Sequence, residues 1–98
     1  MTINYNREAE KLTVAVEGRL DTLTAPEFEK KMGELLGGVS ELVLDMTSLE
    51  YVSSAGLRVI LKAQKVMFNN GKMKLIGVNE SVREVFEITG FDNILNIE

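Results

Sequence analysis

The residues best placed to take part in a chemical reaction are two adjacent serines, Ser53 and Ser54. They lie between an apolar run and a long helical pattern. The run Leu42–Leu44 predicts a buried strand, and the periodicity from about Ala55 to Asn70 predicts a helix. Ser54 falls where a helix N-cap belongs, since a serine there accepts a hydrogen bond from a first-turn N–H. The N-terminus of a helix also stabilises an anion. The position therefore suits a serine that is phosphorylated and dephosphorylated, although a serine that only caps the helix has the same spacing.

The composition limits the classes of function that the chain can have. Its 98 residues are enough for one small domain with a single hydrophobic core. Cysteine and histidine are absent, which removes disulfides, thiolate chemistry, the commonest general base and the commonest transition-metal ligand. The net charge of −4 argues against nucleic-acid binding, because no surplus of basic residues exists to displace counterions.

The sequence also has no catalytic or membrane-spanning motif. A P-loop needs a glycine-rich run before Lys and Ser or Thr, and a hydrolase nucleophile elbow needs flanking glycines and a histidine; neither pattern occurs. No run approaches the roughly 18 apolar residues that span a bilayer, and the first residues do not have the pattern of a signal peptide. We therefore expect a non-enzymatic, cytoplasmic protein without metal, cofactor or direct membrane insertion.

The first part of the chain predicts two strands and a helix. Apolar residues alternate over residues 3–5 and 12–16, which favours antiparallel strands joined by a turn near residues 8–10. The segment Thr24–Glu27 has the form of a capping box with a proline in the first turn of a helix. We expect that helix to end at Gly37–Gly38.

The rest of the chain continues with strands and helices in alternation. Leu42–Leu44 lacks alternation, as expected for a strand covered on both faces, and Lys72–Val78 predicts a further strand. Asn79 is placed to cap a helix that stops at Gly90, and Ile94–Ile97 predicts a terminal strand or a loose tail. This order favours a single α/β domain over all 98 residues, with a mixed sheet of about four to five strands and helices packed on it.

Two features of the central helix have more than one explanation. Val59, Ala63 and Val66 lie beside the main apolar face of this helix, so either a neighbouring helix covers them or their edge is a docking surface. Gly56 in the first turn lowers helix propensity by about 1 kcal/mol relative to alanine. Either a partner approaches closely there, or the helix packs tightly on the sheet.

The stretch Leu42–Leu61 resembles the STAS domain, and in particular the single-domain anti-sigma factor antagonists. Those proteins have an apolar strand ending in Asp, then an aromatic residue, then a serine-containing turn with Gly-Leu that opens a helix. The resemblance extends to Glu17–Asp21, Lys74–Asn79 and Val85–Phe91, so it covers essentially the whole chain in order. It implies a STAS-type α/β fold.

The resemblance also implies that Ser54 is a phosphoacceptor, because the acceptor serine of the family lies two residues before the glycine, here Gly56. The residue before the acceptor, often Asp in the family, is Ser53 in this chain. The residue after it is Ala55, where the family often has Ser or Thr. Ser53 is therefore a rival acceptor.

Residues around the acceptor are expected to meet a partner protein. The candidate contacts are Asp21, Asp45, Thr47, Ser53, Ala55, Gly56, Arg58, Val59 and Ala63. Ordinary structural roles stay open for several of them. Asp21 suits a turn, Asp45 and Thr47 suit capping of their own loop, and Arg58 is either a solvated charge or a partner for a phosphate.

The resemblance implies a partner switch. The unphosphorylated chain, monomeric when free, would bind an anti-sigma factor that is itself a serine kinase, and a sigma factor would be released. The kinase would then phosphorylate Ser54 and end the complex, and a serine phosphatase would reset it. Two alternatives stay open: a STAS subunit of a membrane transporter complex, and a partner-switching STAS protein with a target other than a sigma factor.

Overall fold

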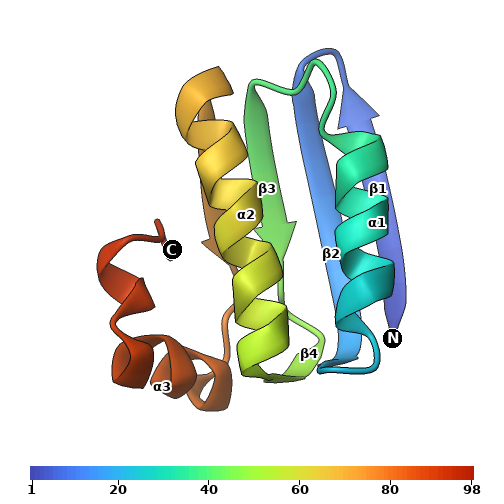
Figure 1. Cartoon of the computed structure of the whole chain (residues 1–98). Coiled ribbons are helices and arrows are strands. Elements are labelled where there is room, and N and C mark those ends of the chain that lie inside the picture. The colour runs from blue at the N-terminus through green and yellow to red at the C-terminus, as the bar shows by residue number, and fades with distance from the viewer.

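The computed structural model describes residues 1–98, the whole chain. Its elements in chain order are β1 (Thr2–Glu8), β2 (Lys11–Leu20), α1 (Ala25–Leu35), β3 (Glu41–Asp45), β4 (Leu49–Val52), α2 (Ser54–Asn70), β5 (Lys72–Ile76), α3 (Glu80–Thr89) and a short 3-10 helix, η1 (Phe91–Asn93). Figure 1 shows α1 and α2 side by side across one face of the sheet. The fold is therefore the expected α/β arrangement of helices packed on a sheet.

The sheet is mixed and has five strands, within the predicted range. Its order is β1-β2-β3-β5, with β4 pairing to the far end of β2. Only the pair β1–β2 is antiparallel; β2–β3, β3–β5 and β2–β4 are all parallel. Because the strands run parallel, their carboxyl ends meet at one edge of the sheet together with the amino ends of the helices that follow them.

The hairpin at the start of the chain confirms the predicted antiparallel strands. Glu8 pairs with Lys11, so the turn consists of Ala9 and Glu10, and Ala9 has a left-handed φ of 55°. In β2 every second side chain is fully buried under the helices; these residues are Leu12, Val14 and Val16. Period-two alternation thus marks β2 as a strand with one face on the core.

Strand β3 is buried along its centre, which explains its unbroken apolar run. Leu42 and Leu44 have no exposed surface, and Val43 on the opposite face is only 4% exposed. Glu41 and Asp45 at its two ends are half-buried. The prediction of a strand without alternation is confirmed.

From the sequence we predict no strand at Leu49–Val52, where the structure has β4. Its burial pattern has Leu49 and Val52 inside and Glu50 and Tyr51 outside, which does not alternate with a period of two. Strand β4 is recognised by its pairing with β2. Strand β2 has 10 residues and extends beyond the end of β3, so its last residues are free to pair with β4. The register of this pairing shifts between Gly18 and Arg19. The chain therefore enters α2 directly from a strand.

The third helix has the predicted boundaries. The Asn79 side chain accepts a hydrogen bond from the Val82 N–H at 2.9 Å, and its Nδ2 donates to the Leu49 carbonyl at 2.7 Å, so the cap also ties α3 to β4. The helix ends at Gly90, which has a left-handed φ of 78°. The expected terminal strand is reduced to a single parallel bridge between Leu75 and Ile97 after η1.

Candidate functional site

The candidate site lies at the edge of the sheet where β2, β3 and β4 end and where α1 and α2 begin (Figure 1). Ser53 and Ser54 occupy the junction between β4 and α2. The Ser53 N–H donates to the Leu20 carbonyl at 2.8 Å, which fixes this junction to the end of β2. The serine pair is thus held by the sheet and not by a free loop.

Ser53, and not Ser54, caps helix α2, so the sequence-based placement of the cap is wrong by one residue. Ser53 has an extended backbone and its hydroxyl accepts a hydrogen bond from the Gly56 N–H at 3.3 Å. The reason is the bond from Ser53 to Leu20, which holds residue 53 in strand geometry and lets the helix begin at Ser54. Ser53 is half-buried and its hydroxyl is engaged.

Ser54 is the first residue of the helix, and it is exposed. Its hydroxyl makes no hydrogen bond within the protein, in contrast to that of Ser53. A rigid backbone therefore presents a free hydroxyl beside the positive end of a helix of 17 residues. This arrangement allows a phosphate on Ser54 without any change to the cap of α2.

Gly56 is buried, and the structure shows why this position is a glycine. A Cβ atom there would lie 2.6 Å from Cγ and 2.9 Å from the carbonyl oxygen of Leu20. The explanation by tight helix-to-sheet contact is therefore confirmed. Contact of Gly56 and of the half-buried Ala55 with a partner stays a prediction.

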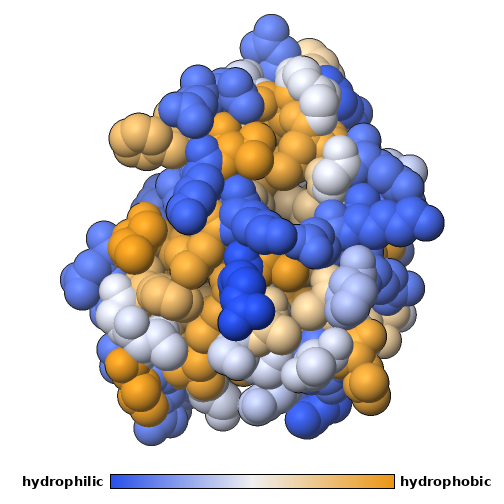
Figure 2. Space-filling model, in the orientation of Figure 1, coloured by the Kyte–Doolittle hydropathy of each residue, from blue (hydrophilic) through white to orange (hydrophobic).

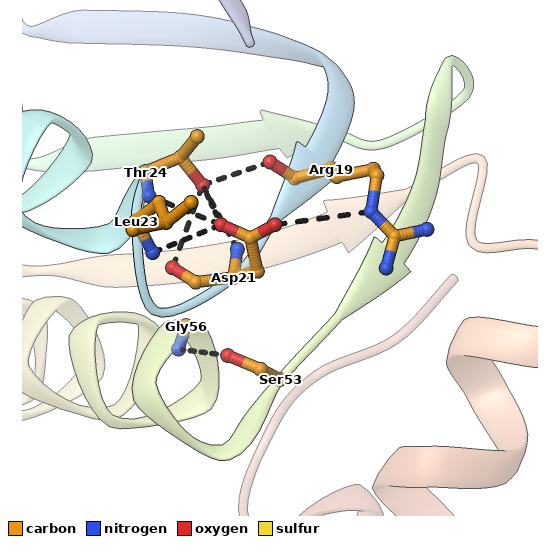
Figure 3. Close-up of polar contacts among 6 residues, drawn as sticks. All are labelled: Arg19, Asp21, Leu23, Thr24, Ser53 and Gly56. Atoms are coloured by element: carbon orange, nitrogen blue, oxygen red, sulfur yellow. Dashed lines mark hydrogen bonds and ion pairs between the residues drawn. The ribbon is translucent and has the colours of Figure 1, made fainter.

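Asp21 organises the loop between β2 and α1 (Figure 3). Its Oδ1 accepts hydrogen bonds from the N–H groups of Leu23 and Thr24 at 3.0 and 3.1 Å, and its Oδ2 lies 3.8 Å from Nε of Arg19. The turn role that the sequence left open for Asp21 is confirmed. Contact of Asp21 with a partner stays a prediction.

The predicted capping box at Thr24 does not form. Thr24 has helical backbone angles, and its hydroxyl donates to the Arg19 carbonyl and accepts from the Asp21 N–H, both at 2.8 Å. The Thr24 hydroxyl is therefore drawn back to the end of β2 and does not reach the first turn of α1. Asp21, three residues earlier, supplies the oxygen that the turn requires.

The carboxyl group of Asp21 has a lowered pKa. Loss of solvent contact raises this pKa, but the hydrogen bonds from Thr24 and Leu23 and the nearby charge of Arg19 lower it by more. Asp21 is consequently ionised at neutral pH and contributes a fixed negative charge to the edge of the sheet that carries Ser54.

Asp45 and Thr47 stabilise their own loop after β3. Asp45 Oδ1 accepts from the Thr47 N–H at 3.0 Å and from the Thr47 hydroxyl at 2.6 Å. The Thr47 side chain fills the space beside Gly77, where a Cβ atom would lie 2.2 Å from its hydroxyl oxygen. Loop capping is confirmed, and no hydrogen bond joins these residues to Ser54 or Asp21.

The proposed docking edge of α2 is largely covered. Val59 is 6% exposed and Ala63 is 3% exposed, because α1 packs against this side of α2. The alternative of a covering helix is therefore confirmed. Contact of Val59 and Ala63 with a partner stays a prediction, and their burial argues against it. Val66, one turn further on, is 41% exposed. Figure 2 shows apolar side chains along the middle of this face, with hydrophilic side chains lying across them.

Arg58 lies one helical turn after Ser54 and is exposed. It forms no ion pair within the protein, whereas Lys62 on the next turn is paired with Glu29 of α1. Arg58 borders a shallow groove between the first turns of α1 and α2, together with Thr22 and Ala55. Its guanidinium is therefore an unpaired positive charge on the first turns of the helix that carries the serine.

Three further side chains at this edge were not selected from the sequence. Leu23 is 88% exposed, and Tyr51 is 40% exposed with the guanidinium carbon of Arg19 at 4.4 Å from its ring centroid. The sequence signal that could have pointed to Leu23 is a single leucine between two threonines, in a turn that begins with an aspartate.

Elsewhere, no group of three or more acidic side chains is placed to hold a metal ion, and none of the helices combines the length and apolar character that a bilayer span requires.

Comparison with known proteins defines the family. The profile of the STAS domain family matches residues 2–98. BtrV of Bordetella bronchiseptica, named as a putative anti-sigma factor antagonist, is 35% identical over 88 residues, which cover 88% of this chain and 76% of that protein. The anti-sigma-B factor antagonist of Staphylococcus aureus is 28% identical over 86 residues, or 86% of this chain and 80% of that protein. The chain therefore belongs to the STAS domain family, among the anti-sigma factor antagonists.

Solved structures share the fold at low sequence identity. An anti-sigma factor antagonist from Mycobacterium paratuberculosis superposes with a TM-score of 0.89 at 22% identity, covering 98% of this chain and 83% of that one. The Bacillus cell fate determinant SpoIIAA in its phosphorylated form superposes with a TM-score of 0.76 at 17% identity, covering 99% and 91%. These likenesses show the common architecture.

Proposed function

We propose that this protein is an anti-sigma factor antagonist that is switched off by phosphorylation of Ser54. In the unphosphorylated form it binds an anti-sigma factor that is also a serine kinase, and so frees a sigma factor. The kinase and a serine phosphatase are separate cytoplasmic proteins, and the nucleotide belongs to the kinase. The observation that carries the proposal is the exposed, unbonded hydroxyl of Ser54 at the first residue of α2.

The choice of Ser54 over Ser53 rests on hydrogen bonding and exposure. The Ser53 hydroxyl accepts from the Gly56 N–H, and loss of such a cap typically costs about 0.5–2 kcal/mol of stability. A kinase that modified Ser53 would have to reach a half-buried oxygen that already accepts this bond. Ser54 offers its hydroxyl with no such cost.

The effect of phosphorylation follows from charge. A phosphate adds about −1.5 to −2 charges at neutral pH, and a helix N-terminus stabilises a nearby anion by roughly 0.3–1 kcal/mol. The free protein therefore accommodates phosphoserine. A partner surface fitted to a neutral hydroxyl does not, and a buried, unpaired charge at an interface costs about 2–5 kcal/mol. A local charge thus suffices, without refolding.

Phosphorylation is tested with the purified anti-sigma factor kinase of the same genome and ATP, with the modified residue located by fragment-ion mass spectrometry. We expect phosphate on Ser54 in the native chain and none in Ser54→Ala. The matched control is Ser53→Asn, which removes the rival hydroxyl and keeps a good N-cap. This variant is expected to be phosphorylated as well as the native chain.

Binding is tested by titration calorimetry with the same kinase. Ser54→Ala is expected to bind as tightly as the unphosphorylated chain, and Ser54→Asp more weakly by about tenfold or more. Thermal unfolding of both variants serves as the control, because an acidic residue in the first turn of a helix does not destabilise it. Equal affinity of the two variants, or phosphate retained in Ser54→Ala, would contradict the proposal.

A further inference from the structure

The first strand has a free edge that pairs with no other part of the chain. Strand β1 pairs only with β2, in an unbroken antiparallel register from Thr2 to Glu8. At the β5 edge of the sheet, in contrast, the Leu75 N–H donates to the Asn96 carbonyl and the Leu75 carbonyl accepts from the Glu98 N–H, both at 2.9 Å. The end of the chain therefore covers part of the β5 edge, whereas the β1 edge is open along the whole strand.

The hydrogen-bond pattern shows which backbone groups lie on this open edge. The Glu10 carbonyl accepts from the N–H groups of Ser40 and Glu41, so the even-numbered residues of β2 direct their backbone groups to β3. The odd-numbered residues of β2 then face β1, and Lys11 is paired with Glu8. The even-numbered residues of β1 are thus bonded to β2. The residues whose N–H and C=O groups point to solvent are the odd-numbered ones, Ile3, Tyr5 and Arg7.

Strand β1 has few of the features that normally protect an open edge. Edge strands commonly carry a proline, a lysine or a bulge that prevents another strand from pairing. Strand β1 has none of these. Its one basic side chain, that of Arg7, is turned inward, because it donates to the carbonyls of Ala9 and Gly37 at 3.0 and 2.9 Å. Tyr5 at the centre of the strand is 52% exposed. Such an edge can accept a further strand through its backbone.

The sequence of β1 is complementary to itself when two copies run antiparallel with Tyr5 at the centre. This register places Tyr5 opposite Tyr5 of the second copy, Ile3 opposite Arg7, Asn4 opposite Asn6, and Thr2 opposite Glu8. The residues that point outward then face one another, so each can exchange both of its backbone hydrogen bonds with the second copy. No like charges lie opposite each other, and an aromatic pair of this kind stabilises antiparallel strands.

We propose that the free edge of β1 binds a second copy of this chain, so that the two sheets join into one continuous sheet about a two-fold axis. This inference does not depend on the proposed role of Ser54. Figure 1 shows β1 at one edge of the sheet, away from α2, so the pairing leaves Ser54 accessible in both copies. The free chain is then monomeric only at low concentration.

Amide hydrogen exchange of the purified chain, followed by NMR at increasing protein concentration, tests the pairing residue by residue. The N–H groups of Asn4 and Asn6 are expected to be protected at every concentration, because they bond β2. Those of Ile3, Tyr5 and Arg7 are expected to exchange fast in the monomer and to slow by about tenfold or more in the dimer. If they stay fast where sedimentation velocity shows a dimer, or if the chain stays monomeric at the concentrations used for NMR, the proposal is overturned.

Charge at position 5 tests the register. Tyr5→Lys places two like charges opposite each other at the two-fold axis, and Tyr5→Glu does the same with the other sign. Each variant is expected to raise the dissociation constant of the dimer by more than about tenfold. A mixture of the two variants is expected to associate more tightly than either alone, because opposite charges then face each other. Sedimentation equilibrium measures all three. A native dissociation constant in both variants, or no gain in the mixture, would contradict the register.

Two further variants serve as controls for this measurement. Phe68→Lys makes the same change of charge at an 81% exposed aromatic residue of α2, and it is expected to dimerise as the native chain does. Ser54→Asp is also expected to keep the native dissociation constant, because β1 lies away from the start of α2. Loss of the dimer in either control would place the interface on α2 and overturn the proposal. Thermal unfolding at low concentration is expected to be nearly native for both variants of Tyr5, whose side chain is half exposed.

Discussion

At the scale of residues, the site depends on which of two neighbouring hydroxyls is already engaged. Ser53 and Ser54 are the same amino acid one position apart, yet one accepts the Gly56 N–H and the other is free. The difference comes from the hydrogen bond between the Ser53 N–H and the Leu20 carbonyl, which no pattern in the sequence predicts. A one-residue shift in the start of a helix therefore exchanges a structural hydroxyl for a chemically available one.

The lowered pKa of Asp21 predicts how the free energy of unfolding depends on pH. Its pKa is lower in the folded protein than its ordinary value, so its ionised form stabilises the fold. That contribution is fully present above the pKa of aspartate in the unfolded chain, about 4, and is lost as pH falls through the lower pKa of the folded state. We expect Asp21→Asn to lower the free energy of unfolding at neutral pH. The difference in this free energy between the variant and the native chain should become smaller below about pH 4.

Urea unfolding of both chains, from neutral pH down to about pH 3, measures this gap. The matched control is Asp92→Asn on the exposed η1 helix, which makes the same change of charge away from the loop. That variant is expected to differ little from the native chain at any pH. If the free energy of unfolding of Asp21→Asn stayed below that of the native chain by the same amount at every pH, the charge of the Asp21 carboxylate would not be what stabilises the loop.

At the scale of elements, the close packing of α2 on β2 explains the glycine in its first turn. An alanine methyl group at residue 56 would meet Cγ and the carbonyl oxygen of Leu20. We expect Gly56→Ala to lower the free energy of unfolding by about 1–3 kcal/mol, because overpacking outweighs the gain in helix propensity. Gly33→Ala on α1 is the matched control, since nothing lies within 4 Å of its added Cβ.

Chemical denaturation of these two glycine variants decides between overpacking and propensity. Gly33→Ala is expected to gain up to about 1 kcal/mol, the difference in propensity alone. If Gly56→Ala were stabilised by a similar amount, the contact between α2 and the end of β2 would be looser than the structure indicates.

The interface between α1 and α2 gives a second prediction at this scale. Ala63 is 3% exposed against α1, so Ala63→Arg is expected to lower the free energy of unfolding by about 2 kcal/mol or more, through overpacking and burial of charge. Val66→Arg, at a position 41% exposed and one turn further on, is expected to change it by about 0.5 kcal/mol at most. Thermal and urea unfolding provide the comparison; equal stability of the two variants would mean that α1 does not cover Ala63.

At the scale of the whole molecule, the architecture could be predicted because its signals are periodic. The alternation in β2, the unbroken apolar run of β3 and the caps at Asn79 and Gly90 each have one physical interpretation. They lead to a mixed sheet with helices packed on it. The family resemblance agrees with them and is confirmed by the match over residues 2–98.

Features that depend on long-range contacts could not be predicted in the same way. Strand β4 exists because β2 extends past β3 and needs a partner, and Thr24 fails to cap α1 because the Arg19 carbonyl attracts its hydroxyl. Burial of Val59 and Ala63 required knowledge of where α1 lies. In each case the competing group depends on the tertiary arrangement, so local patterns do not contain it.

The separation of the helix cap from the free serine has a consequence for how such proteins can diversify. Since the Ser53 side chain secures the start of α2, position 54 can change without a penalty in folding. Under the proposed function, one substitution at position 54 would remove the acceptor and leave a folded protein that always binds, and an acidic residue there would give a folded protein that does not bind. Natural selection could then change the regulation at position 54 by a single amino-acid substitution while the fold stays unchanged.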